Sequence, residues 1–232
     1  MSEILNLINK NILNNNFYIP EINTEIPGKE LSFKQYQTIL DLKMNEGSSL
    51  EDFIEVTDKI IKENFLDTTK LSYIDKIFLL NQLKFSQKDN LFEITLEQYK
   101  ETLRSRCSEL DLNQFSHHFK HKDLEIEFGV NSFDYCYELN KQIFDVGSSN
   151  NIPTLISAEV IRSIKKIIYQ GEELELTYST LSKIIPLMPA NVFKAYSDFS
   201  TKLSSTLSNI NTFNMDGEDV VVFPTIDNLL SL

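Results

Sequence analysis

The amino-acid sequence predicts an α+β protein that is predominantly helical, with an N-terminal β-hairpin and a few short antiparallel strands. Apolar residues recur three and four positions apart over most of the chain, which is the spacing of one face of a helix. Turn residues separate two short extended segments near the N-terminus. A later segment alternates apolar and acidic residues, as a half-exposed strand does.

The composition is that of a folded and acidic protein. Of 232 residues, 41% are apolar and 24% are charged, and sixteen Phe and nine Tyr supply enough apolar surface to offset the entropy of the chain. With 22 basic against 34 acidic residues, the net charge is −12. Such a charge repels a phosphate backbone, so nucleic acid is not an expected partner.

The N-terminal residues predict neither export nor membrane insertion. Residues 1–10 lack the basic region and the long apolar region of a secretory signal. Apolar runs elsewhere are far shorter than the roughly 20 residues that cross a bilayer. We therefore expect an intracellular-type protein that does not enter a membrane.

The first part of the chain predicts a helix and then a hairpin. Residues 3–14 fit a short amphipathic helix whose apolar face is formed by Ile4, Leu5, Ile8 and Ile12. Two extended segments follow at 17–22 and 30–33, separated by the turn signal Pro27-Gly28-Lys29. Pro20 cannot donate a ladder hydrogen bond, so its strand is expected at an edge or with a bulge.

Helices are predicted to dominate the middle of the chain. Residues 36–44 place apolar residues on one face, and capping pairs predict helix starts at Ser49, with Asp52, and at Ser72, with Asp75. The helix after Ser72 is apolar over so wide an arc that we expect it at the centre of the core. Further elements are expected as a strand at 91–95, a helix reaching Leu103 and a strand at 123–129.

The segment Val146–Pro153 is the best linker candidate, because it combines Gly, Ser, Asn and Pro. It suggests an N-terminal domain at 1–147 and a C-terminal helical domain at 148–232, although a single domain is an alternative. Ser157 is expected to cap a helix that bears Val160, Ile161, Ile164, Ile167 and Ile168 and stops at Gly171. Later elements are predicted as a helix at 177–188, a long helix at 189–210 and a strand at 220–223.

One group of residues is a candidate for metal binding. It contains Cys107, His117, His118, His121 and Cys136. Zinc sites usually bring ligands in close pairs, whereas these cysteines are isolated and only His117 and His121 have the i, i+4 relation of one helical face. A zinc-stabilised adaptor or a metal-dependent enzyme is therefore an alternative hypothesis, and the simpler interpretation is the end of a polar surface helix. Two cysteines fit a reducing compartment without a disulfide.

Signatures of catalysis are missing from the sequence. It contains no Gly-x-Ser-x-Gly elbow and no Gly-rich phosphate loop. Acidic pairs such as Glu172-Glu173, and the group Asp216, Glu218 and Asp219, lack the pattern of a calcium loop and are expected to be solvated turns. We therefore predict no catalytic residue, no cofactor and a role in protein binding.

Residues 189–210 present an apolar stripe with two interpretations. It packs either in the core or against a partner helix or a like subunit. The nearly uncharged Ser- and Thr-rich surface from Ser197 to Ser208 favours a binding role, because it costs little to desolvate. The predicted interface residues are Ile4, Ile8, Phe17, Ile19, Phe33, Val192, Tyr196, Phe199, Leu203 and Leu207.

The N-terminal hairpin, from Ile19-Pro20 to Leu31-Ser32-Phe33, precedes a helix and then Leu71-Ser72-Tyr73-Ile74-Asp75-Lys76-Ile77-Phe78-Leu79-Leu80-Asn81-Gln82-Leu83-Lys84. This arrangement resembles the baseplate hub and hub-assembly proteins of T4-like contractile-tailed bacteriophages. The resemblance covers residues 17–130 and, more loosely, the segment 184–189 before the long helix. Members of that family tend to have Arg at the position of Lys84, and some have paired cysteines in the middle.

The resemblance implies a non-catalytic viral protein that helps to build, or remains in, the hub of the tail baseplate. Its partners would be other tail proteins, and it would be found in the host cytoplasm during assembly or in the virion tail. No catalytic residue is carried over. A further alternative is an acidic cytoplasmic adaptor that binds a basic protein.

Overall fold

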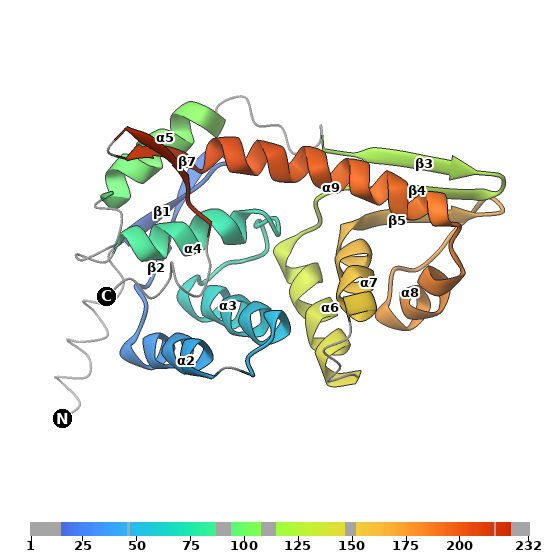
Figure 1. The fold of residues 1–232 in the computed structure, drawn as a ribbon, viewed down its shortest axis with the longest axis horizontal. Coiled ribbons are helices and arrows are strands. Elements are labelled where there is room, and N and C mark those ends of the chain that lie inside the picture. The colour runs from blue at the N-terminus through green and yellow to red at the C-terminus, as the bar shows by residue number, and fades with distance from the viewer. Residues whose placement is uncertain are drawn as a thin grey trace. The chain divides into compact units, whose positions relative to one another are not determined.

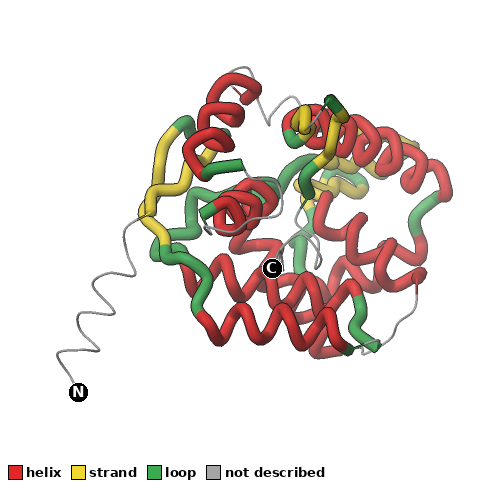
Figure 2. The backbone as a smooth tube through the Cα atoms, turned by 60° about the vertical axis from the view of Figure 1, so that its left-hand side comes forward, coloured by secondary structure: helices red, strands yellow, loops and turns green. Residues whose placement is uncertain are grey.

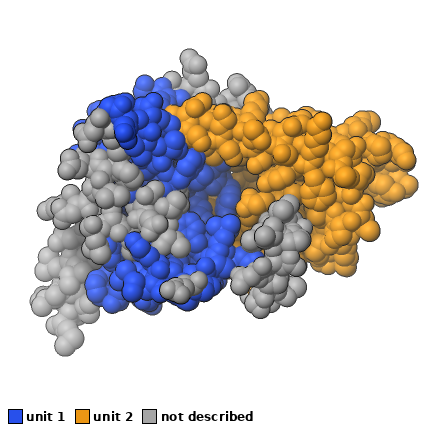
Figure 3. All heavy atoms as spheres, in the orientation of Figure 1, with its two compact units in different colours: residues 1–110, 210–232 blue, residues 111–209 orange. Residues whose placement is uncertain are grey.

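The computed structural model describes residues 15–45, 47–86, 94–107, 115–146, 152–215 and 217–223, and it confirms the α+β class. The chain forms two compact units (Figure 3). Unit 1 contains residues 1–110 and 210–232, and unit 2 contains residues 111–209. This division differs from the predicted boundary at 147/148. Helices α6 (Phe133–Val146) and α7 (Ile152–Ser163), on either side of residues 147–151, both belong to unit 2 and pack on each other.

The described residues of unit 1 form a β-hairpin, four helices and a second hairpin at 212–221 (Figure 1). Its elements are β1 (Asn15–Ile19), β2 (Thr24–Gly28), α2 (Phe33–Met44), α3 (Leu50–Asn64), α4 (Asp75–Phe85), α5 (Leu96–Cys107), β7 (Thr212–Met215) and β8 (Glu218–Val221). Each hairpin is an antiparallel two-stranded sheet of its own. The predicted helix at 3–14 and residues 91–93 of the predicted strand lie outside the described residues.

Unit 2 is built on an antiparallel sheet with the strand order β3-β4-β5-β6. Its elements are β3 (His117–His121), β4 (Leu124–Phe128), α6 (Phe133–Val146), α7 (Ile152–Ser163), β5 (Ile164–Tyr169), β6 (Glu172–Glu173), α8 (Tyr178–Ile184), a 3-10 turn η2 (Ile185–Leu187) and α9 (Ala190–Ile210). Helix is the commonest state of the described backbone (Figure 2). The expected strand at 123–129 and the helices expected at 177–188 and 189–210 are confirmed.

The N-terminal hairpin forms, but its second strand differs from the prediction. Strand β2 covers residues 24–28, and the turn lies at 20–23, where Asn23 has a φ of 46°. Pro27 is therefore a strand residue opposite Asn16. The predicted strand at 30–33 is wrong, because Ser32 accepts a hydrogen bond from the backbone of Gln35 and caps α2.

The capping signals in the middle of the chain predict the structure correctly. Ser49 and Asp52 form a reciprocal capping box at the start of α3. The backbone N–H and hydroxyl of Ser72 donate to Oδ2 of Asp75 at 2.8 and 2.9 Å, and α4 begins at Asp75. Ten of the eleven residues of α4 are buried, so the wide apolar arc does indicate a central helix.

Residues 164–169 form strand β5, which contradicts the helix predicted from Ser157 to Gly171. Helix α7 ends at Ser163, and Ile167 then lies opposite Ile126 of β4. β-Branched residues suit a pleated sheet as well as a helical stripe, and the neighbouring strand decides between them. The predicted strand at 220–223 is present as β8 at 218–221 and pairs with β7.

The core of unit 1 requires a glycine at position 28. The rings of Phe17 and Phe65 meet edge to face with their centroids 5.0 Å apart. A Cβ atom on Gly28 would lie 2.5 Å from the ring of Phe65 and 2.8 Å from that of Phe17. The close packing of two rings on backbone, and not the turn that the sequence suggests, is therefore the reason for glycine here.

Polar side chains buried around α4 join distant parts of unit 1. The amide nitrogen of Asn81 donates to the Tyr99 hydroxyl, to Oδ1 of Asn211 and to the carbonyl of Val222, at 2.9, 3.1 and 3.0 Å. The Tyr99 hydroxyl also donates to Oδ1 of Asn211 at 2.7 Å. This network ties α4 and α5 to the segment that returns to unit 1 after α9.

The core of unit 2 lies where α9 meets the sheet. Phe128 of β4 packs against Tyr196 and Phe199, with ring centroids 6.0 and 6.4 Å apart. Elsewhere in unit 2, the guanidinium of Arg162 in α7 donates to Oδ1 of Asn140 in α6 at 2.8 Å. The packing on Phe128 and the burial of Val192, Phe199 and Leu207 show that this part of the apolar stripe of α9 belongs to the core.

We expect Gly28→Ala to lower the free energy of unfolding by about 1–3 kcal/mol, because the added methyl group overpacks the Phe17 and Phe65 rings. Urea unfolding of the full chain measures this change. Gly47→Ala is the matched control, because its Cβ would meet only Oδ1 of Asn45, at 3.4 Å. Equal effects of the two substitutions would contradict the packing argument.

We expect Asn81→Leu to cost about 1–3 kcal/mol of stability, because it leaves the buried carbonyl of Val222 without the donor that it now has. Thermal and urea unfolding measure the loss. A change below about 0.5 kcal/mol, which is typical of surface substitutions, would show that the network contributes little.

Candidate protein-binding surface

Helix α2 is fixed to the end of α3 by buried amides. The side-chain nitrogen of Gln35 donates to Oδ1 of Asn64 at 2.6 Å and to Glu63 at 2.9 Å. The side-chain nitrogen of Asn64 in turn donates to the carbonyls of Lys29 and Glu30, at 3.0 and 3.2 Å. These bonds set the position and the rotation of α2 from its first turn.

The inner face of α2 is small. Only Gln35 and Ile39 are buried among its twelve residues. They lie four positions apart, and therefore on one side of the helix. Tyr36, Leu40 and Leu42 are half-buried, and the other side chains of α2, Phe33 and Met44 among them, are exposed.

The outer face of α2 carries an apolar strip beside polar residues, because Gln37 and Asp41 lie on the same side. Phe33 is 76% exposed and Met44 is 75% exposed, and Leu40, which is half-buried, lies between them. At about 100° per residue these three residues fall within about 40° of one another, on the side opposite Gln35. We refer to Phe33, Leu40 and Met44 as the α2 stripe.

Exposed apolar residues lie at or near the ends of helices α2 and α3. Among the described residues, eight large apolar side chains are exposed, and Phe33, Met44, Leu50 and Leu66 are four of them. Leu66 is 77% exposed and directly follows Phe65, so it lies at the end of α3 to which the start of α2 is tied. Single exposed apolar residues are ordinary, whereas a set on one helix face indicates an interaction site.

Most of the interface residues predicted from the sequence belong to the core. Phe17, Ile19, Val192, Phe199 and Leu207 are buried, and Tyr196 and Leu203 are half-buried. The five buried residues cannot contact a partner while they pack inside the chain, whereas Tyr196 and Leu203 keep part of their surface accessible. Ile4 and Ile8 lie outside the described residues. Phe33 is the one predicted residue, among those that the structure describes, that is fully on the surface.

Helical spacing identified apolar faces correctly but could not say which of them the chain itself covers. Leu40 and Met44 were recognised as part of a helix face, and Leu66 gave no signal at all. One signal was available: around the axis of α2, Ile39 points away from Phe33 and Met44, so a single core contact could not bury all three.

The proposed metal ligands do not form a site. His117, His118 and His121 lie in strand β3, which contradicts the helix end expected there. At about 3.3 Å per residue, His117 and His121 are roughly 13 Å apart along the strand, too far to bind one ion. Within the described ranges, no group of three or more His, Cys, Asp or Glu residues could hold a metal ion.

Neither cysteine forms a disulfide, and both are buried. Cys107 ends α5 in unit 1, and burial, with the nearby charge of Asp75, raises the pKa of its thiol to about 12. Cys136 lies in α6 of unit 2, with its sulfur 3.9 Å from the carbonyl of Arg162. A thiol such as Cys107 stays protonated near neutral pH and is a poor nucleophile and a poor metal ligand.

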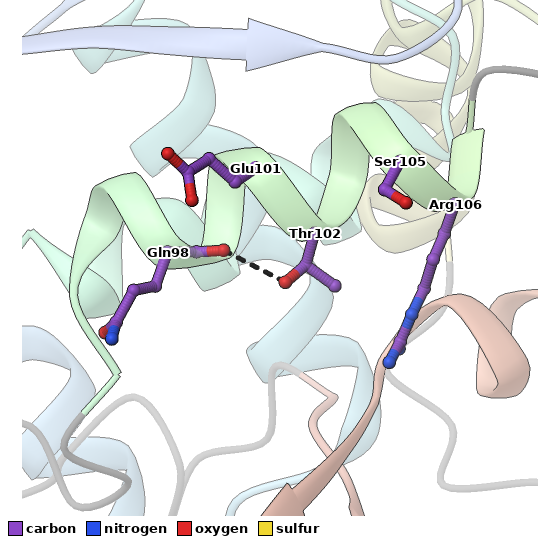
Figure 4. Close-up of a pocket in the computed structure, with 5 residues that line it drawn as sticks. All are labelled: Gln98, Glu101, Thr102, Ser105 and Arg106. Atoms are coloured by element: carbon purple, nitrogen blue, oxygen red, sulfur yellow. Dashed lines mark hydrogen bonds between the residues drawn. The ribbon is translucent and has the colours of Figure 1, made fainter.

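A polar pocket of about 420 Å³ lies along α5 (Figure 4). It is lined by Gln98, Glu101, Thr102, Ser105 and Arg106, all from one face of the helix. Arg106 donates to the carbonyls of Ile210, at 2.9 Å, and Thr212, and its guanidinium lies 5.3 Å from the centre of the Phe213 ring. Its main role in the structure is therefore to hold strand β7.

No known protein family, curated protein or solved structure matches this chain. None of the described helices is both long enough and apolar enough to span a bilayer. The α2 stripe is the surface feature with the clearest geometry for binding.

We expect protein purified without chelator to contain zinc well below one equivalent, and its melting temperature to be unchanged by EDTA. The reason is the separation of His117 from His121 on β3 and the buried, protonated thiol of Cys107. Elemental analysis and differential scanning fluorimetry measure the two quantities. One equivalent of zinc, with a lower melting temperature after chelation, would restore the hypothesis of a zinc-stabilised protein.

Proposed function

We propose that this chain is a non-catalytic structural or assembly component of the baseplate hub of a contractile phage tail, and that it binds a neighbouring tail protein through the α2 stripe. The observation that carries the proposal is the exposure of Phe33 and Met44 on a helix whose inner face is already packed. The resemblance of residues 17–130 to hub and hub-assembly proteins supports the choice of partner.

The geometry of the stripe fits the helix-in-groove mode of recognition. Phe33, Leu40 and Met44 are spaced seven and four residues apart, so they can enter one apolar groove of a partner. Burying a side chain such as Phe or Met contributes about 1.5–3 kcal/mol. Met also adapts its shape to a partner surface, because it is unbranched.

The anchoring of α2 favours binding without a large loss of entropy. Gln35 and Asn64 already hold the helix in place before a partner arrives, so the stripe is presented on a rigid element. The net charge of −12 keeps the free chain soluble and favours a partner with a basic rim.

Phe33→Asp and Met44→Asp are each expected to weaken binding to the cognate hub protein at least about tenfold, because a charge then faces an apolar groove. Co-expression with the hub proteins of the same phage, followed by pull-down and titration calorimetry, measures the effect. Leu187→Asp is the matched control: Leu187 is 82% exposed, lies in unit 2 and is not part of the stripe. Circular dichroism should show that all three variants remain folded.

Two results contradict different parts of the proposal. Absence of the chain from both virions and assembly intermediates, with no hub protein bound, would remove the tail context. Binding that is unchanged in both stripe variants would show that the partner uses another surface.

A further inference from the structure

Strand β3 is an edge strand of the sheet in unit 2. The strand order is β3-β4-β5-β6, and among the described residues β3 pairs with β4 alone. Its side chains are not packed away: His118 and Lys120 are exposed, and the other three residues of the strand are half-buried. Within the described part of the chain, the outer edge of β3 therefore presents a row of backbone donors and acceptors that no strand satisfies.

The hydrogen bonds of the sheet identify the backbone groups at this edge. The N–H of Gln170 donates to the carbonyl of Asp123 at 2.9 Å, so the odd-numbered residues of β4 bond toward β5 and the even-numbered residues bond toward β3. The even-numbered residues of β4 lie opposite the odd-numbered residues of β3. The N–H and C=O groups of His118 and Lys120 therefore point away from β4, to the outer edge.

The side chains of β3 make this edge basic. Five of the six residues at 117–122 are His or Lys, in a chain whose net charge is −12. His118 and Lys120 lie on one face of the sheet, and Phe119 lies on the other face with a histidine on either side. A strand at the outer edge would meet basic groups on its first face and an aromatic ring on its second.

Strand β4 shows which kind of strand fits beside β3. Glu125 lies opposite Lys120 and forms an ion pair with it, and Ile126 lies opposite Phe119. The second glutamate of β4 lies opposite His118. Such cross-strand pairs contribute about 0.2–1 kcal/mol each. The same alternation of apolar and acidic residues therefore suits a strand on the other side of β3.

A second copy of β3 does not fit this edge. Antiparallel pairing through the outward groups would put His118 or Lys120 of one copy opposite His118 or Lys120 of the other. Like charges directly opposite each other destabilise a sheet, and basic side chains on an edge strand discourage pairing between copies. The same side chains attract a strand of opposite charge.

We propose that the outer edge of β3 binds an extended segment of another protein in which apolar and acidic residues alternate. The segment adds a strand to the sheet, with backbone hydrogen bonds to His118 and Lys120, carboxylates beside their side chains and an apolar side chain beside Phe119. This surface lies in unit 2, and it depends neither on the α2 stripe nor on the tail context.

A peptide titration of the full chain, followed by NMR, tests the proposal. The probe is a capped peptide with the β4 sequence Leu-Glu-Ile-Glu-Phe between serines, and the matched control is Leu-Lys-Ile-Lys-Phe with the same flanks. The acidic peptide should bind at least about tenfold more tightly, because the lysines turn two attractive cross-strand pairs into repulsive ones. The net charge of the chain favours the opposite order, so it cannot produce this result.

Amide hydrogen exchange locates the bound peptide. The amides of His118 and Lys120 should exchange at least about tenfold more slowly in the complex, because the added strand accepts from them. The amide of Phe119 bonds toward β4 and should keep its rate.

His118→Pro and His118→Ala isolate the backbone contact. Proline removes the outward N–H and is tolerated at an edge position whose N–H does not serve the ladder, whereas alanine keeps the N–H. His118→Pro should bind the acidic peptide at least about threefold more weakly than His118→Ala. Circular dichroism should show that both variants are folded.

Four results would overturn the inference. Three are measured on the wild-type chain, and they decide the matter even if His118→Pro does not fold: no binding of the acidic peptide up to about 2 mM, equal binding of the two peptides, or exchange that slows at Phe119 and not at His118 and Lys120. The fourth is equal binding by folded His118→Pro and His118→Ala, which would show that the peptide does not use the backbone edge.

Discussion

The burial of helix α4 on all sides is the constraint on which unit 1 depends. A central helix with polar residues must bring hydrogen-bond partners from every element around it, because an unsatisfied buried polar group costs about 1–3 kcal/mol. Gln82 takes its partner from β1, Asn81 takes its partners from α5 and the C-terminal return, and Lys76 takes its partner from α3. Segments far apart in the sequence therefore meet at one helix, and the polar contacts specify which segment goes where.

Helix α2 lies outside this set of contacts, and for that reason much of its surface is not needed to pack the core. Its connection to the core is made by Gln35 and Ile39, so the opposite side has no structural demand to meet. Apolar residues on such a side reduce solubility without stabilising the chain. Binding to a partner explains why they are on the surface. In unit 2 the stripe of α9 has the opposite role, because Phe199 packs on Phe128 of the sheet.

Local chemistry in the sequence predicts the local structure well. Ser49 with Asp52 and Ser72 with Asp75 indicate helix starts, because the capping partners are three residues apart. The alternation of apolar and acidic residues at 124–128 indicates a strand, because it too is a pattern among sequence neighbours. Features that depend on distant neighbours were not predictable. Ile164 to Tyr169 has spacing that also suits a helix, and pairing with β4 makes it a strand. The candidate surface was predicted only at Phe33, since periodicity reveals an apolar face and does not reveal what covers it.

The order in which a ribosome makes the chain gives the Asn81 network a further consequence. Unit 2 is continuous in sequence, from residue 111 to residue 209, so it can fold as soon as that stretch has left the exit tunnel. Unit 1 is made first but waits longest, because Asn81 and Tyr99 need Asn211 and the carbonyl of Val222, which are more than one hundred residues further on. During synthesis the amide of Asn81 lacks these partners until residues 211 and 222 have been made. Unit 1 is therefore the later of the two units to complete its folding, although its first segment is made before unit 2.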